Sequence, residues 1–129
     1  MPLVTLTVQD AMAPAQRRRL LDTIHAALVA VGVPAADRFQ RVIVLAPEDL
    51  VVDPHYPAPA GGPHPRDHRF VMVEVLWSVG RSVTLKRQFM QHLVDAQREA
   101  GFDPEQLLLV FKETAWENWS FAGGRLLHA

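Results

Sequence analysis

The stretches LVTLTV (residues 3–8) and FVMVEVLW (residues 70–77) decide the fold of this chain. Both are rich in apolar and β-branched residues, which is typical of β-strands. Each is followed by a segment with apolar residues at helical spacing and then by another apolar run, FQRVIVL (39–45) or QLLLVFKE (106–113). The sequence therefore predicts two successive β-α-β units.

The ends of the two predicted helices carry separate signals. Pro14 suits the first turn of the first helix, which we expect to run to about Val31, and Gly32 suits its end. Ser82 can cap the amino end of the second helix. A shift of 69 residues superposes the apolar positions of the two units: Val4 on Val73, Leu6 on Val75, Val8 on Trp77, Leu20 on Phe89, Leu21 on Met90, Ile24 on Leu93 and Gly32 on Gly101.

A tandem repeat of this kind leaves one side of its sheet uncovered. Parallel crossovers are almost always right-handed, so one layer of two helices covers one face of a four-stranded sheet. The other face would carry Leu3, Thr5, Met72 and Leu76. An apolar face needs a partner, which predicts an oligomer.

Length and composition favour one small globular domain. The chain has 129 residues, of which 49% are hydrophobic, with repeat halves at about 2–52 and 70–121. A net charge of −1 disfavours a nucleic-acid partner, and no apolar run is long enough for a membrane span or a secretion signal. The absence of cysteine removes thiol chemistry and is compatible with a cytoplasmic protein.

The segment DPHYPAPAGGPHPRDHR (53–69) links the halves and holds five prolines and two glycines. Such a composition predicts a long surface loop. Its histidines, His55, His64 and His68, suggest a metal site, but Pro65 prevents the helix that would align the last two as ligands. A solvated loop that borders a pocket is the favoured interpretation.

Three residues could carry chemistry, and each has a plain structural alternative. Pro2 is allowed at the start of a strand, but removal of Met1 would make it a free secondary amine. Asp37 is an ordinary turn residue or a reactive carboxylate at a strand end. Arg81, in GRS (80–82), belongs to a tight turn or binds a carboxylate beside the positive end of a helix.

Two aromatic residues stand in the glycine-flanked tail ENWSFAGGR (117–125). Trp119 and Phe121 could pack against a neighbouring subunit. They could equally form an apolar wall of a pocket and lower the local dielectric constant around an amine or carboxylate.

These features together resemble the tautomerase superfamily, and within it the malonate semialdehyde decarboxylase-like branch. The resemblance rests on Pro2 after Met1, the doubled β-α-β unit, GVPAADRFQ (32–40), GRS (80–82) and NWSF (118–121). It implies an α+β fold in which a four-stranded mixed sheet carries two helices on one face. It also implies a homotrimer around a central barrel, which would cover the open sheet face.

The resemblance implies catalysis without a cofactor by an amino-terminal proline. The pKa of an α-amino group is about 8; apolar walls or cations lower it and a carboxylate raises it. With a lowered pKa, Pro2 would act as a base on a small 2-keto or enol acid. Asp37 would position water or keep Pro2 protonated, Arg81 would bind the substrate carboxylate, and Trp119 and Phe121 would wall the pocket.

One position departs from the decarboxylase pattern. That pattern has a second arginine two residues before the one matched by Arg81, where this chain has Val79. Arg38, Arg66 or Arg69 could supply the missing charge. The favoured hypothesis is therefore a tautomerase, and the alternatives are a decarboxylase or hydratase with a cationic Pro2 and a trimeric binding module without catalysis.

Overall fold

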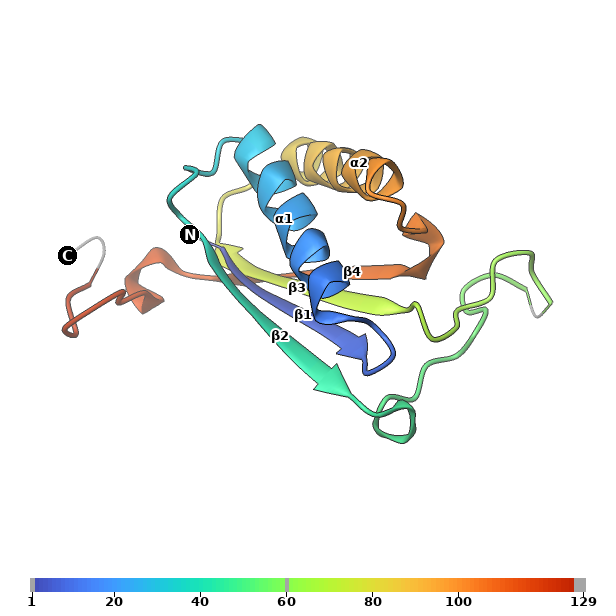
Figure 1. The fold of residues 1–129 in the computed structure, drawn as a ribbon. Helices are drawn as coiled ribbons and strands as arrows, with labels where there is room; N and C mark the ends of the chain where they lie inside the picture. Colours follow the sequence, from blue (N-terminus) through green and yellow to red (C-terminus); the bar gives the residue numbers. More distant parts are fainter. Residues whose placement is uncertain (1, 60, 127–129) are drawn as a thin grey trace.

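The computed structural model describes residues 2–59 and 61–126 of the chain (Figure 1). Its elements follow the order predicted from the sequence, with boundaries that agree within one residue for the strands. They are β1 (Leu3–Gln9), α1 (Pro14–Ala30), β2 (Phe39–Leu45), β3 (Val71–Ser78), α2 (Val83–Glu99) and β4 (Leu107–Thr114), with short 3₁₀ turns η1 (Pro47–Asp49), η2 (Pro104–Gln106) and η3 (Trp116–Asn118).

The four strands form one mixed sheet in the order β2-β1-β3-β4. Each β-α-β unit contributes a parallel pair, and the units meet through the antiparallel pair β1 and β3. Leu3 at the start of β1 pairs with Phe39 at the start of β2 and with Leu76 near the end of β3. The starts of β1 and β2 and the ends of β3 and β4 therefore lie at the same end of the sheet.

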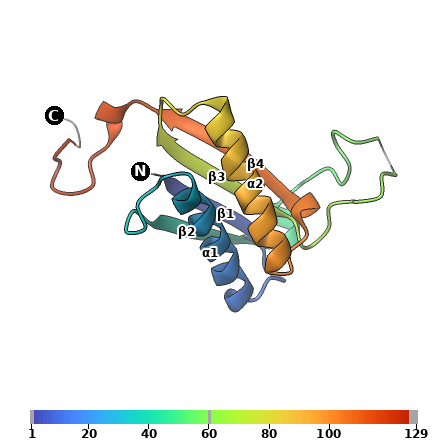
Figure 2. The same ribbon diagram turned by 90° about the horizontal axis from the view of Figure 1, so that it is seen from above.

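Both helices lie on one face of the sheet and pack against each other (Figures 1 and 2). The core lies between this helix layer and the sheet, where alternate strand residues point towards the helices. Its fully buried side chains include Leu6, Leu20, Ile24, Val73, Trp77, Phe89 and Leu93. The predicted arrangement of two helices on one sheet face is confirmed.

The helix ends use the residues that the sequence indicates. The Ser82 hydroxyl accepts a hydrogen bond from the Leu85 N–H at 3.1 Å and caps α2. Gly32 after α1 and Gly101 after α2 have φ values of +107° and +86°, a region that favours glycine. The two units thus end their helices in the same way.

The buried face of α2 does not repeat that of α1 position by position. Met90, which the 69-residue shift aligns with the buried Leu21, is 41% exposed. Gln97, which the same shift aligns with the buried Leu28, is buried although it is polar. Because α2 packs through Phe89, Leu93 and Gln97, the shift that relates the two units does not determine which side chains are buried.

No described segment covers the second face of the sheet, as Figure 1 shows. This open face carries exposed apolar side chains on the two edge strands, Ile43 on β2 and Leu108 and Val110 on β4. An ion pair between Lys112 and Glu74 at 2.6 Å also lies across β3 and β4. Thr5 accepts a hydrogen bond from Arg41 at 3.0 Å on the same face.

The segment between β2 and β3 leaves the sheet at the end far from the start of β1 (Figure 1). Its turns are held locally: the Asp53 carboxylate accepts hydrogen bonds from the N–H groups of His55 and Tyr56, and Arg66 donates to the Asp53 carbonyl. Across residues 2–59 and 61–126, no helix is long and apolar enough to cross a membrane. The same residues contain no cluster of three metal-binding side chains.

Candidate active site

The predicted site residues come from segments at the sheet end where β1 and β2 start and β3 and β4 end, and of these residues only Asp37 and Arg81 line the cavity found there. Pro2 is buried and directly precedes Leu3. Because Val4 belongs to the core, the alternation along the strand places Pro2 on the helix-facing side as well. Met1, whose removal would expose the Pro2 nitrogen, lies outside the described residues.

A cavity of about 350 Å³ at this end contains both Asp37 and Arg81 in its wall. Asp37 comes from the turn before β2, and Arg81 from the turn between β3 and α2. The rest of the wall is mostly apolar and is formed by Val31, Gly32, Val33, Pro34, Trp77, Leu85 and Trp116. One carboxylate and one guanidinium in an otherwise apolar wall suit a small charged ligand, because a side chain of opposite charge at a fixed position can bind it.

Arg81 lies against aromatic rings. Its guanidinium carbon is 4.7 Å from the ring centroid of Trp77 and 5.8 Å from that of Trp116. Nη1 donates a hydrogen bond to the Ser78 carbonyl oxygen. Burial lowers the pKa of Arg81 from its usual value, and the negative charges of Glu113 and Asp37 oppose this shift.

Asp37 is half-buried in a tight turn, where its N–H donates to the Pro34 carbonyl at 3.0 Å. The neighbouring Arg38 points to the helix layer instead. Its guanidinium donates to the Asp22 carboxylate at 2.6 Å and to the Gln40 side chain at 2.8 Å. Arg38 is not among the described residues that line the cavity.

Trp119 and Phe121 lie on the segment that follows β4 and extends past the sheet end (Figure 1). Their rings stack at 5.8 Å, and the Phe121 ring lies 5.4 Å from that of Phe39 at the start of β2. In the single chain, neither aromatic belongs to the cavity wall. The two rings form an aromatic group beside the predicted site.

Sequence reasoning missed two residues of the cavity wall, Trp77 and Trp116. Trp77 is fully buried at the end of β3, where its ring stacks on that of Phe111 at 4.8 Å. Trp116 begins η3 just after β4. The available signal for Trp116 was its aromatic side chain three positions before Trp119. Its position in the sequence gave no reason to place it beside Arg81.

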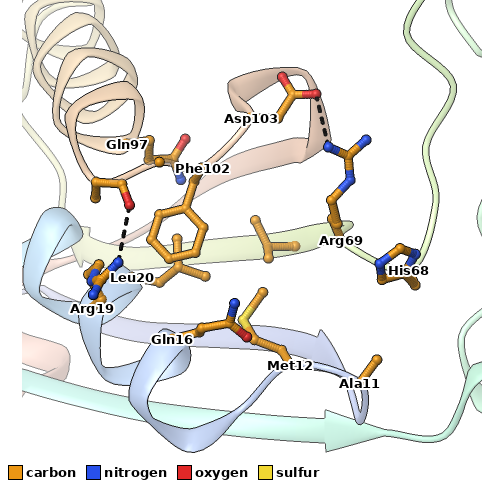
Figure 3. Close-up of a pocket in the computed structure, with 13 residues that line it drawn as sticks. Ala11, Met12, Gln16, Arg19, Leu20, His68, Arg69, Gln97, Phe102 and Asp103 are labelled. Carbon is orange, nitrogen blue, oxygen red and sulfur yellow. Dashed lines mark hydrogen bonds and ion pairs between the residues drawn. The ribbon is translucent and has the colours of Figure 1, made fainter.

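A second cavity of about 360 Å³ lies at the opposite end of the sheet (Figure 3). Arg19 and Arg69 stand on opposite sides of it, with the Phe102 ring between them. Arg19 donates to the Ala100 carbonyl at 3.3 Å, and Arg69 binds Asp67 at 2.8 Å and approaches Asp103 at 3.9 Å. Arg19 and Arg69 are thus engaged in contacts that join helices and loops. We therefore take the cavity with Asp37 and Arg81 as the candidate site.

Comparison with known proteins assigns the chain to a family. A family model described as "Tautomerase enzyme" matches residues 37–122, which is more than half of the chain. The chain therefore belongs to the tautomerase family. A search of proteins with curated descriptions gave no match.

Solved structures of malonate semialdehyde decarboxylases are similar over nearly the whole chain. One, solved in wild-type, mutant and inactivated forms, is 30% identical, covers 96% of this chain and 93% of its own, and has a TM-score of 0.83. Another, inhibited by 3-bromopropiolate, is 26% identical, covers 98% and 93%, and has a TM-score of 0.86. A fused 4-OT solved as a symmetric trimer, at 22% identity, 98% and 97% coverage and a TM-score of 0.75, shares the fold.

Proposed function

We propose that this chain is a cofactor-independent tautomerase that interconverts the keto and enol forms of small 2-keto acids. The observation that carries the proposal is the joint presence of Asp37 and Arg81 in one mainly apolar cavity at the sheet end where Pro2 directly precedes β1. The proposal requires removal of Met1, because an amide nitrogen has no basicity. The family match supports an enzyme of this superfamily.

The three polar groups divide the reaction between them. Arg81 binds the substrate carboxylate and stabilises the negative charge that develops on the enolate oxygen. During ketonisation the Pro2 amine accepts the enol hydroxyl proton, and the resulting ammonium returns a proton to C3; the reverse reaction removes the C3 proton. Asp37 acts as an assisting acid or holds a water molecule. Every proton that leaves oxygen is thus returned to carbon.

The active form is proposed to be a homotrimer. The open sheet face with Ile43, Leu108 and Val110 supports this, since an exposed apolar face is normally covered. The fused 4-OT relative is a trimer. In the assembly, Trp119 and Phe121 would wall the pocket from beyond the sheet end, and Arg38 would add positive charge near the substrate.

The first experiment measures ketonisation of phenylenolpyruvate by purified protein whose intact mass shows that Met1 is gone. Replacement of Pro2 by Ala leaves a mobile primary amine in place of the ring-held secondary amine and should lower kcat by about 100-fold or more, the range of general-base catalysis. Pro47→Ala, in the remote turn η1, is the matched control and should retain activity. Full activity of the Pro2→Ala protein, or retention of Met1 in an active enzyme, would exclude this mechanism.

A lyase is the second candidate function, because two malonate semialdehyde decarboxylases are 26% and 30% identical to this chain. In that reaction a cationic Pro2 and Asp37 would decarboxylate malonate semialdehyde or hydrate an activated three-carbon acid. Val79 in place of a second arginine favours the tautomerase. Proton NMR of acetaldehyde formed from malonate semialdehyde distinguishes the two, and no product above the Pro2→Ala background would remove the lyase.

A further inference from the structure

A buried glutamine lines the cavity at the sheet end opposite the candidate site (Figure 3). Gln97 on α2 is 1% exposed, and its Oε1 has no hydrogen-bond partner among the described residues. Gln106, which is 2% exposed, uses both ends of its amide: Oε1 accepts from the Asp67 N–H at 3.1 Å, and Nε2 donates to the Pro65 carbonyl at 2.9 Å. Burial of an amide oxygen without a partner is costly, so the Gln97 amide is open to a hydrogen bond from a ligand.

The position of Gln97 in the fold does not require a polar side chain. The 69-residue shift aligns it with Leu28, which is 1% exposed in the first unit. A leucine would therefore fill the same place on the inner face of α2 without an unpaired polar atom. Packing of the helix layer does not explain the amide, whereas a ligand with a hydrogen-bonding group would.

The cavity beside Gln97 is large enough for an organic ligand. Its volume of about 360 Å³ lies within the range of small-molecule sites, which is about 300 to 1,000 Å³. Part of its wall is apolar: Met12, Leu20 and Val71 contribute buried side chains. Phe102 adds a half-buried ring that lies beside Gln97 in Figure 3. These side chains suit a ligand with an aromatic ring.

The cavity wall also holds a cation that no described carboxylate neutralises. Arg19 on α1 is exposed, donates to the Ala100 carbonyl oxygen at 3.3 Å and forms no ion pair with a described residue. Across the cavity, Arg69 is paired with Asp67 at 2.8 Å and approaches Asp103 at 3.9 Å. Of the two arginines, Arg19 is therefore the better partner for an anionic group of a ligand.

The chemistry of an amide indicates which group of the ligand would meet Gln97. A hydroxyl both donates and accepts a hydrogen bond, so it can pair with either end of the amide. A carboxylate only accepts, and an ammonium group would bring an unbalanced charge into a buried place. A neutral hydroxyl thus fits the buried amide, and a carboxylate fits the exposed Arg19.

We propose that this cavity is a second binding site, separate from the candidate active site, for a small aromatic carboxylic acid that carries a hydroxyl group. Arg19 binds the carboxylate on the exposed side of the cavity. The aromatic ring lies against Phe102, and the hydroxyl pairs with the amide of Gln97. The site involves no covalent step and does not depend on the proposed function.

Calorimetric titration compares the three isomeric hydroxyphenylacetates with phenylacetate, which lacks the hydroxyl. All titrations use the Arg81→Ala protein, so that binding of a carboxylate in the candidate active site is weakened. The isomers place the hydroxyl at different distances from the carboxylate. At least one should bind more tightly than phenylacetate by about 3- to 10-fold, the worth of a neutral hydrogen bond. Equal Kd values for all of these acids would overturn the proposal.

Two variants assign the binding to the wall residues. Gln97→Leu should remove the advantage of the hydroxy acid and leave the Kd of phenylacetate nearly unchanged. Arg19→Ala should raise both Kd values by about 2- to 5-fold, the worth of an exposed ion pair, and should weaken their dependence on salt. Because Arg19 is exposed, this second variant tests the site even if Gln97→Leu does not fold.

Arg18→Ala is the matched control for the loss of one charge. Arg18 is next to Arg19 in the chain but pairs with Asp22 and is outside the cavity wall. Its replacement should leave both Kd values nearly unchanged. Equal effects of Arg18→Ala and Arg19→Ala, or a full hydroxyl advantage in Gln97→Leu, would contradict the proposed site.

Amide NMR spectra of the isotope-labelled protein locate the ligand. The N–H signals of Gly101 and Phe102 should shift during the titration, whereas those of Gly32 and Val33 in the wall of the candidate active site should not. Shifts confined to Gly32 and Val33 would overturn the second site and leave the tautomerase intact. Shifts at Gly101 and Phe102 support the second site even where the wild-type protein does not ketonise phenylenolpyruvate, a result that rejects only the tautomerase.

Discussion

Three arginines of this chain differ in how much of their positive charge is balanced by neighbouring groups. Arg38 donates to the Asp22 carboxylate and Arg69 to the Asp67 carboxylate, so a large part of each positive charge is already balanced. Arg81 instead lies against two indoles and donates to a backbone carbonyl. Neither of these contacts brings a negative charge, and the nearby carboxylates of Glu113 and Asp37 favour the charged form of Arg81, in which it can bind an anionic ligand.

This difference predicts unequal effects of removing the guanidiniums of Arg81 and Arg38. Arg81→Ala should raise KM for phenylenolpyruvate by about 10- to 100-fold, the worth of a charged hydrogen bond. Arg38→Ala should raise KM by only about 2- to 5-fold, since its pair with Asp22 limits its contribution. Steady-state kinetics of both variants provide the measurement. A larger effect at Arg38 would show that the assembled enzyme redirects this side chain to the substrate.

At the scale of elements, the two β-α-β units have similar helix ends but different buried helix residues. Gly32 and Gly101 end α1 and α2 with positive φ values, in positions that the 69-residue shift relates. The same shift relates the buried Leu28 to Gln97, whose buried side-chain oxygen has no hydrogen-bond partner among the described residues. The units therefore share a backbone plan while their core residues differ.

The pair of Asp67 and Arg69, in the turn that leads into β3, should make the stability of the fold depend on pH. Hydrogen bonds from Arg69 lower the pKa of Asp67 to about 2, from an ordinary value of 3.8. Because the folded carboxylate binds its proton less readily than the unfolded one, its stabilising effect is complete above about pH 4 and is lost as the pH falls to about 2. The free energy of unfolding should decrease across this window.

Urea denaturation between pH 5 and pH 2 measures this contribution. In the Asp67→Asn protein, stability should decrease less steeply between about pH 4 and pH 2 than in the wild type. Asp10→Asn, outside this turn, is the control for the loss of one carboxylate. Parallel curves for the wild-type and Asp67→Asn proteins would show that the pair with Arg69 does not contribute to the acid sensitivity.

At the scale of the whole molecule, the helices cover one face of the sheet and leave the other open. The exposed apolar residues Ile43, Leu108 and Val110 lie on edge strands, beside the Lys112 and Glu74 ion pair. The candidate site lies at one end of this sheet, next to the segment that carries Trp119 and Phe121. The proposed trimer would bury the open face and enclose the site at once.

Replacement of an apolar residue of the open face by a charged one should therefore dissociate the proposed trimer. Val110→Asp places a carboxylate on β4 in the expected interface, where burial of an unpaired charge is costly. Val29→Asp is the matched control, since Val29 on α1 is 38% exposed and Val110 is 39% exposed. Sedimentation velocity should give a monomer for the first variant and a trimer for the second. A trimeric Val110→Asp protein would place the interface elsewhere.

Much of the fold was predictable because its signals are local. Runs of apolar and β-branched residues mark the strands, helical spacing marks α1 and α2, and Ser82, Gly32 and Gly101 mark helix ends. The burial of individual helix positions was not predictable in this way, since Met90 is 41% exposed although the repeat aligns it with the buried Leu21. Pro2, Asp37 and Arg81 could be nominated through the resemblance of their motifs to a known family.

The sequence by itself determined the two β-α-β units, their helix ends and the proline at the head of β1, because each depends on residues close together in the chain. Only the tertiary structure decided that Asp37, Arg81 and Trp116 line one cavity and that Arg38 pairs with Asp22. The physical reason is that β3 and β4 run antiparallel to β1 and β2 in one sheet, which brings the turns before β2, after β3 and after β4 to the same sheet end. No spacing along the chain contains that information.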